Sequence, residues 1–162
     1  MGNLKNKWVK PGSAFNYTEA QRLKAAEDIT TNDIVVITGI VGGIGIVNKA
    51  DCGTLRLRDG RLLIAKHDIP AGGYGVGLPW ELISGWDTGN GSGSAGSFGD
   101  YWLVGGSGAG LGGAGKMINE GSTEGGNIIA ASMARPIAKT ITPSSADGVA
   151  DGAIYMAVET PL

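Results

Sequence analysis

Short runs of β-branched and other apolar residues, separated by glycine, dominate the chain from residue 34 onward. IVVITGI at 34–40 and VGGIGIV at 41–47 follow each other with almost no turn between them. In the first run both alternating sets of positions are largely apolar, which is typical of a strand covered on both faces. Further runs predict strands at YWLV (101–104) and within GVGLPWELISGW (75–86), NIIAASMARPIAKTI (127–141) and AIYMAVE (153–159).

Two segments have other patterns. Thr18 and Gln21 form a weak capping box at the start of EAQRLKAAED (19–28), so we predict a short helix there, with a strand as the alternative. TLRLRDGRLLIAK (54–66) alternates leucine with arginine and then contains Asp59-Gly60, a strong turn signal. This second segment therefore predicts a β-hairpin.

Glycine is the feature of the composition that changes this picture. The 162 residues include 30 glycines, and only 17% are charged. Glycine costs about 1 kcal/mol per helical position relative to alanine, so the composition favours turns and short strands and predicts an all-β body. Glycine-rich tracts at 87–97 and 105–115 predict surface loops. We divide the chain into an N-terminal arm, residues 1–24, and a body, residues 25–162.

Charge and cysteine content argue against several classes of partner. Thirteen Lys and Arg against fifteen Asp and Glu give a net charge of −2, so no broad basic field attracts nucleic acid or anionic lipid. No apolar run is long enough for a membrane helix, and MGNLKNKWVK lacks the apolar core of a signal peptide. A single cysteine leaves no internal disulfide. We expect the protein to be made in a reducing cytoplasm, and either to stay there or to be assembled there into something that later leaves it, without nucleic acid or membrane as a partner.

The tract GSGAGLGGAGK at 106–116 matches two nucleotide-binding frames by spacing alone. Gly110, Gly115 and Lys116 fit G-x-x-x-x-G-K, and Gly108, Gly110 and Gly113 fit G-x-G-x-x-G. The context required for phosphate binding is missing, because the preceding strand ends too early and Met117 replaces the Ser or Thr that would hold magnesium. Further glycines follow soon after and argue against a helix. We interpret both matches as chance.

The other candidate residues also have simpler structural explanations. His67 predicts a solvated turn, and Cys52, beside acidic Asp51, predicts an ordinary small turn residue without thiolate activation. Asp147 and Asp151 each precede glycine and predict turns more readily than a calcium site. Three tryptophans could form a sugar platform, although core or interface packing is the stronger prediction for at least two of them: Trp80, Trp86 and Trp102. We expect no catalytic residue, cofactor or metal.

The N-terminal arm carries aromatic and apolar residues among lysines, without helical spacing. Such side chains need cover from water, either on the body of the same chain or on a partner. Lys5, Lys7 and Lys10 suit a hydrated, extended strap, so we favour a partner. The predicted anchors are Trp8, Val9, Pro11, Phe15 and Tyr17.

Residues 25–66 resemble the core of the small tailed-phage capsid decoration, or head cement, proteins. The similarity lies in Asn32-Asp33-Ile34-Val35-Val36, in VGGIGI (41–46) and in GRLLIAK (60–66), and GDYWLV (99–104) is similar to the strand that usually follows. The pattern covers about half of the chain, which is longer than is usual for the family. The resemblance implies a compact β-barrel or β-tulip body, a homotrimer, and an arm that crosses the capsid surface. It implies no catalytic residue.

From these observations we expect a structural protein, not an enzyme, that binds the major capsid protein on the outer surface of a virion. The arm residues Trp8, Val9, Pro11, Phe15 and Tyr17 are then the capsid-binding residues. A trimer would multiply modest affinities of single contacts. The alternative is a carbohydrate-binding or host-attachment module on a virion, in which the glycine loops and Trp80 or Trp86 contact a glycan.

Overall fold

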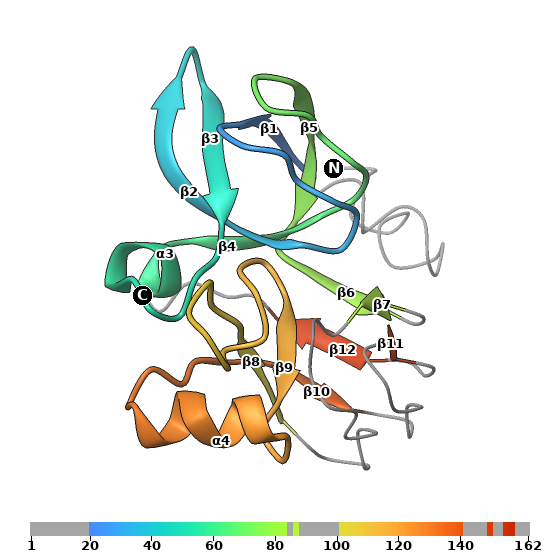
Figure 1. The fold of residues 1–162 in the computed structure, drawn as a ribbon. Coiled ribbons are helices and arrows are strands. Elements are labelled where there is room, and N and C mark those ends of the chain that lie inside the picture. The colour runs from blue at the N-terminus through green and yellow to red at the C-terminus, as the bar shows by residue number, and fades with distance from the viewer. Residues whose placement is uncertain (1–19, 84–85, 88–100, 141–148, 151–153, 158–162) are drawn as a thin grey trace.

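Five strands near the start of the chain close into a barrel. The computed structural model describes residues 20–83, 86–87, 101–140, 149–150 and 154–157. The barrel order is β1-β3-β2-β4-β5 (Figure 1), and β1 closes it by pairing parallel with β3 and antiparallel with β5. The five barrel strands are β1 (Gln21–Ala25), β2 (Ile34–Val41), β3 (Ile44–Lys49), β4 (Leu62–Ala65) and β5 (Tyr74–Leu78).

A second, antiparallel sheet has the order β6-β12-β10-β8-β9. Figure 1 shows it below the barrel, with helix α4 (Thr123–Ala130) below it and the short helix α3 (Leu55–Asp59) at the side, near the barrel's β4. Strands β7 (Trp86–Asp87) and β11 (Val149–Ala150) form a separate pair. The strands of the second sheet are β6 (Trp80–Ile83), β8 (Tyr101–Val104), β9 (Met117–Asn119), β10 (Pro136–Thr140) and β12 (Ile154–Ala157).

Strands β2 and β4 contribute to two hydrophobic cores. Val35 and Leu63 point into the barrel, where Leu23, Ala25 and Val47 are also buried. The alternate residues of the same strands pack against the second sheet, together with Trp102, Ile118 and Ile128; these residues are Ile34, Val36, Leu62 and Ile64. The two-faced pattern is therefore confirmed at 34–37 but not at Ile40, which is exposed, and the all-β prediction with a barrel body is confirmed.

Where the sequence predicted consecutive strands at 34–40 and 41–47, the structure has the β2–β3 hairpin. Gly42 and Gly43 form its turn with φ of 58° and 76°, a region that side chains with a Cβ adopt rarely. The strand at 101–104 is β8, and β12 lies within the predicted 153–159 run. The single strand predicted at 75–86 is instead divided, with Pro79 between β5 and β6.

The segment at 19–28 contains strand β1, the alternative we had left open, and not the predicted helix. Leu23 and Ala25, two residues apart, are both buried in the barrel, whereas Ala26 is exposed. Pairing with β3 and β5 therefore prevails over a weak helical signal. Because β1 begins at Gln21, the barrel already includes the last four residues of the predicted arm.

The predicted hairpin at 54–66 is also wrong in its first half, which forms α3. The amide N–H groups of Leu57 and Arg58 both donate to the carbonyl of Thr54, which closes a helical turn. Arg135 then donates to the carbonyls of Arg58 and Gly60 at the end of the helix. A distant arginine thus supplies hydrogen bonds that the local leucine–arginine alternation could not indicate.

Helix α4 occupies a region where we predicted a strand and argued against a helix. Ser122 caps it by accepting a hydrogen bond from the Gly125 amide. A Cβ on Gly125 would collide with the carbonyl of Asn119, so the helix can start here only with glycine. Ile128 anchors the helix in the lower core.

The tract at 105–115 is exposed only in its middle. Residues 107–110 are exposed, as a surface loop predicts, whereas Gly105 and Gly106 are buried. The Cys52 amide donates to the Gly105 carbonyl, and the Gly115 amide donates to the Ala50 carbonyl. The tract is therefore tied to the end of β3. Most of the other predicted loop, at 87–97, lies outside the described residues.

Candidate interaction surface

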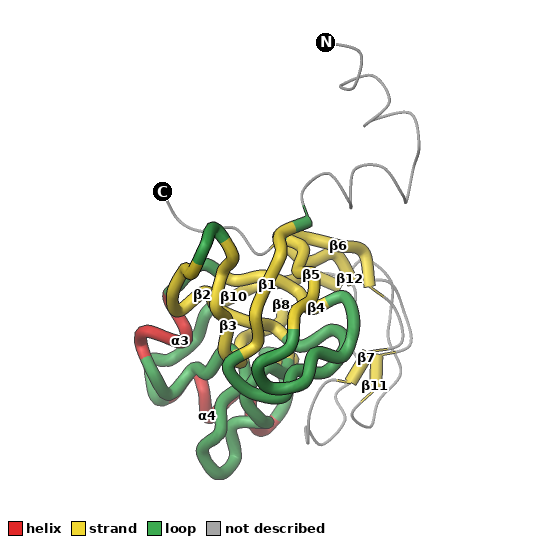
Figure 2. The backbone as a smooth tube through the Cα atoms, turned by 90° about the horizontal axis from the view of Figure 1, so that it is seen from above, coloured by secondary structure: helices red, strands yellow, loops and turns green. Residues whose placement is uncertain are grey.

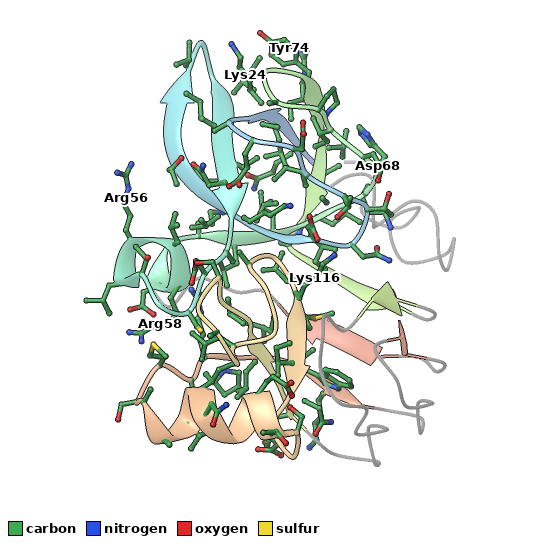
Figure 3. All side chains as sticks on the ribbon, in the orientation of Figure 1. Lys24, Arg56, Arg58, Asp68, Tyr74 and Lys116 are labelled. Atoms are coloured by element: carbon green, nitrogen blue, oxygen red, sulfur yellow. The ribbon has the colours of Figure 1, made fainter. Side chains whose placement is uncertain are left out.

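Lys116, the lysine of the nucleotide-binding frame, holds a buried carboxylate. Its Nζ lies 3.0 Å from Oδ1 of Asp33, whose side chain is fully buried. Lys49 Nζ lies 3.8 Å from the other oxygen, Oδ2, which also accepts 2.8 Å hydrogen bonds from the amide and hydroxyl of Thr30. Figure 3 shows Lys116 at the junction of the barrel with the lower sheet.

Strand β9 follows Lys116 directly, and α4 begins only at Thr123. The phosphate cradle of a nucleotide site requires a helix at this point. Lys116 thus connects the two halves of the body, and the chance interpretation of both glycine frames agrees with the geometry. The argument that glycines exclude a helix soon after this tract was wrong, because Gly125 and Gly126 lie in α4.

Cys52 lies in a turn, as predicted, and its thiol is buried. Burial raises the pKa of the thiol above its ordinary value, and the negative charge of Asp51 adds to the effect. Asp51 accepts hydrogen bonds from the Ser107 hydroxyl at 2.5 Å and from the Gly53 amide at 2.9 Å. The carboxylate therefore organises two turns, and together with burial it disfavours the thiolate, which is the reactive form.

Of the remaining candidates, the structure describes the side chains of His67 and Trp102. His67 is exposed, with Nδ1 3.0 Å from the carbonyl oxygen of Asp68. Trp102 is fully packed in the lower core, as predicted for at least two of the three tryptophans. The side chains of Trp80 and Trp86 are not among those described. Asp147, Asp151 and the predicted capsid-binding residues Trp8, Val9, Pro11, Phe15 and Tyr17 also lie outside the described residues.

The two ends of the barrel differ. At one end the segments 26–33 and 66–73 cross it, and Ile29 pairs with Ile69 in an isolated antiparallel bridge. Both isoleucines are buried in the barrel core. Asp68 accepts hydrogen bonds from the amide of Thr31 at 2.8 Å and from its hydroxyl at 2.9 Å, which ties the two segments together and lowers the pKa of the Asp68 carboxyl.

The residues that the structure describes leave the opposite end open, and we call it the barrel mouth. Figure 2 shows the start of β1 and the β2–β3 turn at this same end. Ile37 reaches inward and packs on the barrel core, whereas the side chain of Ile40 is 73% exposed and that of its neighbour Val41 is 62% exposed. The mouth holds a cavity of about 330 Å³ lined by Gln21, Arg22, Ile37, Ile40, Gly43, Gly45 and Arg61.

Positive charge surrounds this apolar opening. Arg22, on β1, and Arg61, directly before β4, are both exposed, and neither forms a salt bridge with another residue that the structure describes. Arg58, by contrast, is paired with Asp59 at 2.7 Å. The mouth thus offers guanidinium groups beside isoleucine side chains, a combination suited to aromatic or acidic apolar groups.

One edge of β2 is unpaired next to the mouth. Strand β4 pairs with β2 only from Ile34 to Val36. Beyond that point the Ile37 amide donates to the Arg61 carbonyl at 2.9 Å, and the Arg56 guanidinium donates to the Thr38 carbonyl at 2.7 Å. Within the described part of the chain no strand follows along the rest of this edge, as far as Val41. Such an edge can receive an extended segment.

Sequence reasoning missed the mouth. The signal available was the pair of large apolar residues, Ile40 and Val41, directly before a Gly-Gly turn. A hairpin tip that projects from its barrel cannot bury such residues against its own sheet, so they mark a contact surface. The sequence around Arg22 did not indicate a binding surface, because Arg22 reaches the mouth only when β1 pairs with its neighbours and closes the barrel.

Among the described residues, no three or more His, Cys, Asp or Glu side chains come together in a way that could hold a metal ion. None of the helices described has the length and apolar character needed to cross a membrane. Comparisons of the chain with models of known protein families, with curated proteins and with solved structures find no match.

Proposed function

We propose that this chain is a structural phage capsid decoration protein, which binds the major capsid protein on the outer surface of the virion as a homotrimer. The single observation that carries the proposal is the resemblance of residues 25–66 and 99–104 to that family. These residues include β2, β3, β4 and β8, so the resembling segments belong to the folded body.

The chemistry of the described surface supports a role in binding without catalysis. The buried carboxylates Asp33 and Asp51 accept hydrogen bonds that serve the fold, and the thiol of Cys52 is kept protonated. Two exposed apolar residues, Ile40 and Val41, instead lie next to each other at the hairpin tip. A cement protein stabilises a shell by burying such residues at seams between subunits, and three copies joined together strengthen each weak contact.

Co-sedimentation with empty, expanded capsids of the encoding phage tests the proposal. We expect the full chain to pellet with capsids, and deletion of residues 2–17 to abolish binding. Replacement of Ile40 and Val41 by serine should weaken binding, because both side chains are exposed at the hairpin tip. Ile129→Ser is the matched control, since Ile129 is 48% exposed on α4, away from the barrel. Unchanged binding by the deletion variant would exclude the arm as the anchor.

Light scattering of the purified chain tests the homotrimer separately, with three copies expected and a monomer as the contrary result. A glycan array tests the carbohydrate-binding alternative. Burial of Trp102 removes one of the three tryptophans considered for a sugar platform. Glycan binding that is lost on Trp80→Ala or Trp86→Ala, together with absent capsid binding, would favour the alternative.

A further inference from the structure

We propose that the barrel mouth is a docking site for the N-terminal arm of the same chain, and that Phe15 and Tyr17 cover it in the free protein. The inference does not depend on the proposed function, because it concerns the isolated protein. The observation behind it is the contrast between the two ends of the barrel. One end is closed by Ile29 and Ile69, and the other leaves Ile37 and Ile40 beside a cavity of about 330 Å³.

The arm joins the body at the rim of this cavity. Gln21, the first residue of β1, is itself part of the lining. A β-turn over Tyr17–Ala20 would return Tyr17 to within about 7 Å of Ala20, and Phe15 lies about 7 Å further along an extended chain. Both side chains can therefore reach the mouth. A tether this short gives the segment a local concentration in the millimolar range, higher than a separate molecule normally achieves.

The chemistry of the segment matches that of the mouth. Phe15 and Tyr17 are two residues apart, so an extended segment presents both on one face and Asn16 on the other. Their rings can pack on Ile37 and Ile40, and the guanidinium groups of Arg22 and Arg61 can stack on their faces. The edge of β2 beyond Thr38, along which no described strand runs, offers main-chain hydrogen bonds to the same segment.

The charges at the mouth favour docking of residues 11–19 of the arm over residues 1–10. Lys5, Lys7 and Lys10 would be repelled by Arg22 and Arg61, whereas residues 11–19 contain no lysine or arginine and include Glu19. Gly43, one of the two glycines that line the mouth, adds to the fit. Gly43 has nothing within 4 Å of the position a Cβ would take, so the wall of the mouth leaves room beside it.

Nuclear magnetic resonance of the full chain with labelled isoleucine methyl groups tests the proposal. We expect ring-current shifts of the Ile37 and Ile40 methyl signals and Overhauser contacts from these methyls to the rings of residues 15 and 17. Both should disappear in the double variant Phe15→Ser/Tyr17→Ser. Asn16→Ser is the matched control and should change nothing, and the buried Ile34 and Ile64 should report an intact fold in every variant.

Two outcomes would overturn the proposal. Identical Ile37 and Ile40 signals in the full chain and in the double variant would mean that the arm does not occupy the mouth. Shifts that fade on tenfold dilution would mean that the arm of a second copy, not the chain's own arm, is the occupant. Capsid sedimentation gives an independent answer, so failure of the proposed function would leave the methyl result standing, and the reverse also holds.

Discussion

Replacing Lys116 by methionine should destabilise the protein, because the buried carboxylate of Asp33 would lose its nearer cation. Asp33 is fully buried, and Lys116 is the closer of its two cations, at 3.0 Å against 3.8 Å for Lys49. Methionine retains an apolar, unbranched side chain of similar length, so the main loss is the charged hydrogen bond. The loss in free energy of unfolding therefore reports how much the Lys116–Asp33 pair contributes to joining the barrel and the lower sheet.

The size of the effect follows from the burial and the remaining partners. Removing one partner of a fully buried ion pair costs about 3–5 kcal/mol. Lys116 keeps 22% of its side chain exposed, and the carboxylate retains Lys49 and both groups of Thr30. We therefore expect a loss of about 2 kcal/mol, within the range for a hydrogen bond to a charged group. For a domain of this size that corresponds to a fall in Tm of about 4–8 °C.

Urea unfolding at neutral pH, with the slope of the transition checked for constancy, measures this loss. Lys49→Met is the matched comparison and should cost less than about 1 kcal/mol, because its pair is longer and partly exposed. A double-mutant cycle with Asp33→Asn should give a coupling of about 1–2 kcal/mol for Lys116. A cost below about 0.5 kcal/mol for Lys116→Met, or an equal cost for Lys49→Met, would refute the reasoning.

Three further predictions concern other parts of the body. Cys52 should react with a thiol reagent at neutral pH only when urea unfolds the protein, and fast labelling of the native protein would contradict this. Its pKa is raised in the folded state, so it stabilises the fold at pH values below the pKa of the unfolded thiol, and this contribution is lost as the pH rises through the pKa of the folded thiol. Thr31→Val should raise the Asp68 pKa in an NMR titration by removing one hydroxyl donor, with the amide donor retained, and an unchanged pKa would contradict the assignment. Gly126→Ala should stabilise α4 by about 1 kcal/mol in urea unfolding, whereas Gly125→Ala should destabilise it because its Cβ has no room; equal effects would contradict the packing.

The sequence was sufficient where burial follows a simple period. At β2 both alternating sets are apolar, and each set enters a different core, so the strand and its two covered faces could be predicted. Local pattern and tertiary environment agree at these positions.

Prediction failed where a distant contact decides the local structure. The leucine–arginine alternation before Asp59 indicates a strand, but Arg135 provides the hydrogen bonds that complete α3. Glycine counted against α4, although close approach to Asn119 makes glycine necessary at Gly125. Sequence periodicity contains no information of this kind, because it describes neighbours along the chain only.

The barrel mouth could not be predicted for a related reason. It exists because β1 pairs with β5, some 50 residues later, and because β4 stops pairing at Val36 while β2 continues to Val41. Neither the partner of a strand nor the point at which pairing ends is specified by its own residues. The exposed isoleucine at the tip was visible in the sequence, but its surroundings were not.

The wall formed by β2 and β4 has a consequence for how the protein can be dissected. A fragment that ends at Leu78 would contain all five barrel strands. It would, however, expose a continuous hydrophobic surface to water, formed by Ile34, Val36, Leu62 and Ile64. Such a fragment should aggregate, and the remainder of the chain would lack the surface on which Trp102 rests. Barrel and lower sheet should consequently melt in a single cooperative transition, and neither could be exchanged as a self-sufficient module.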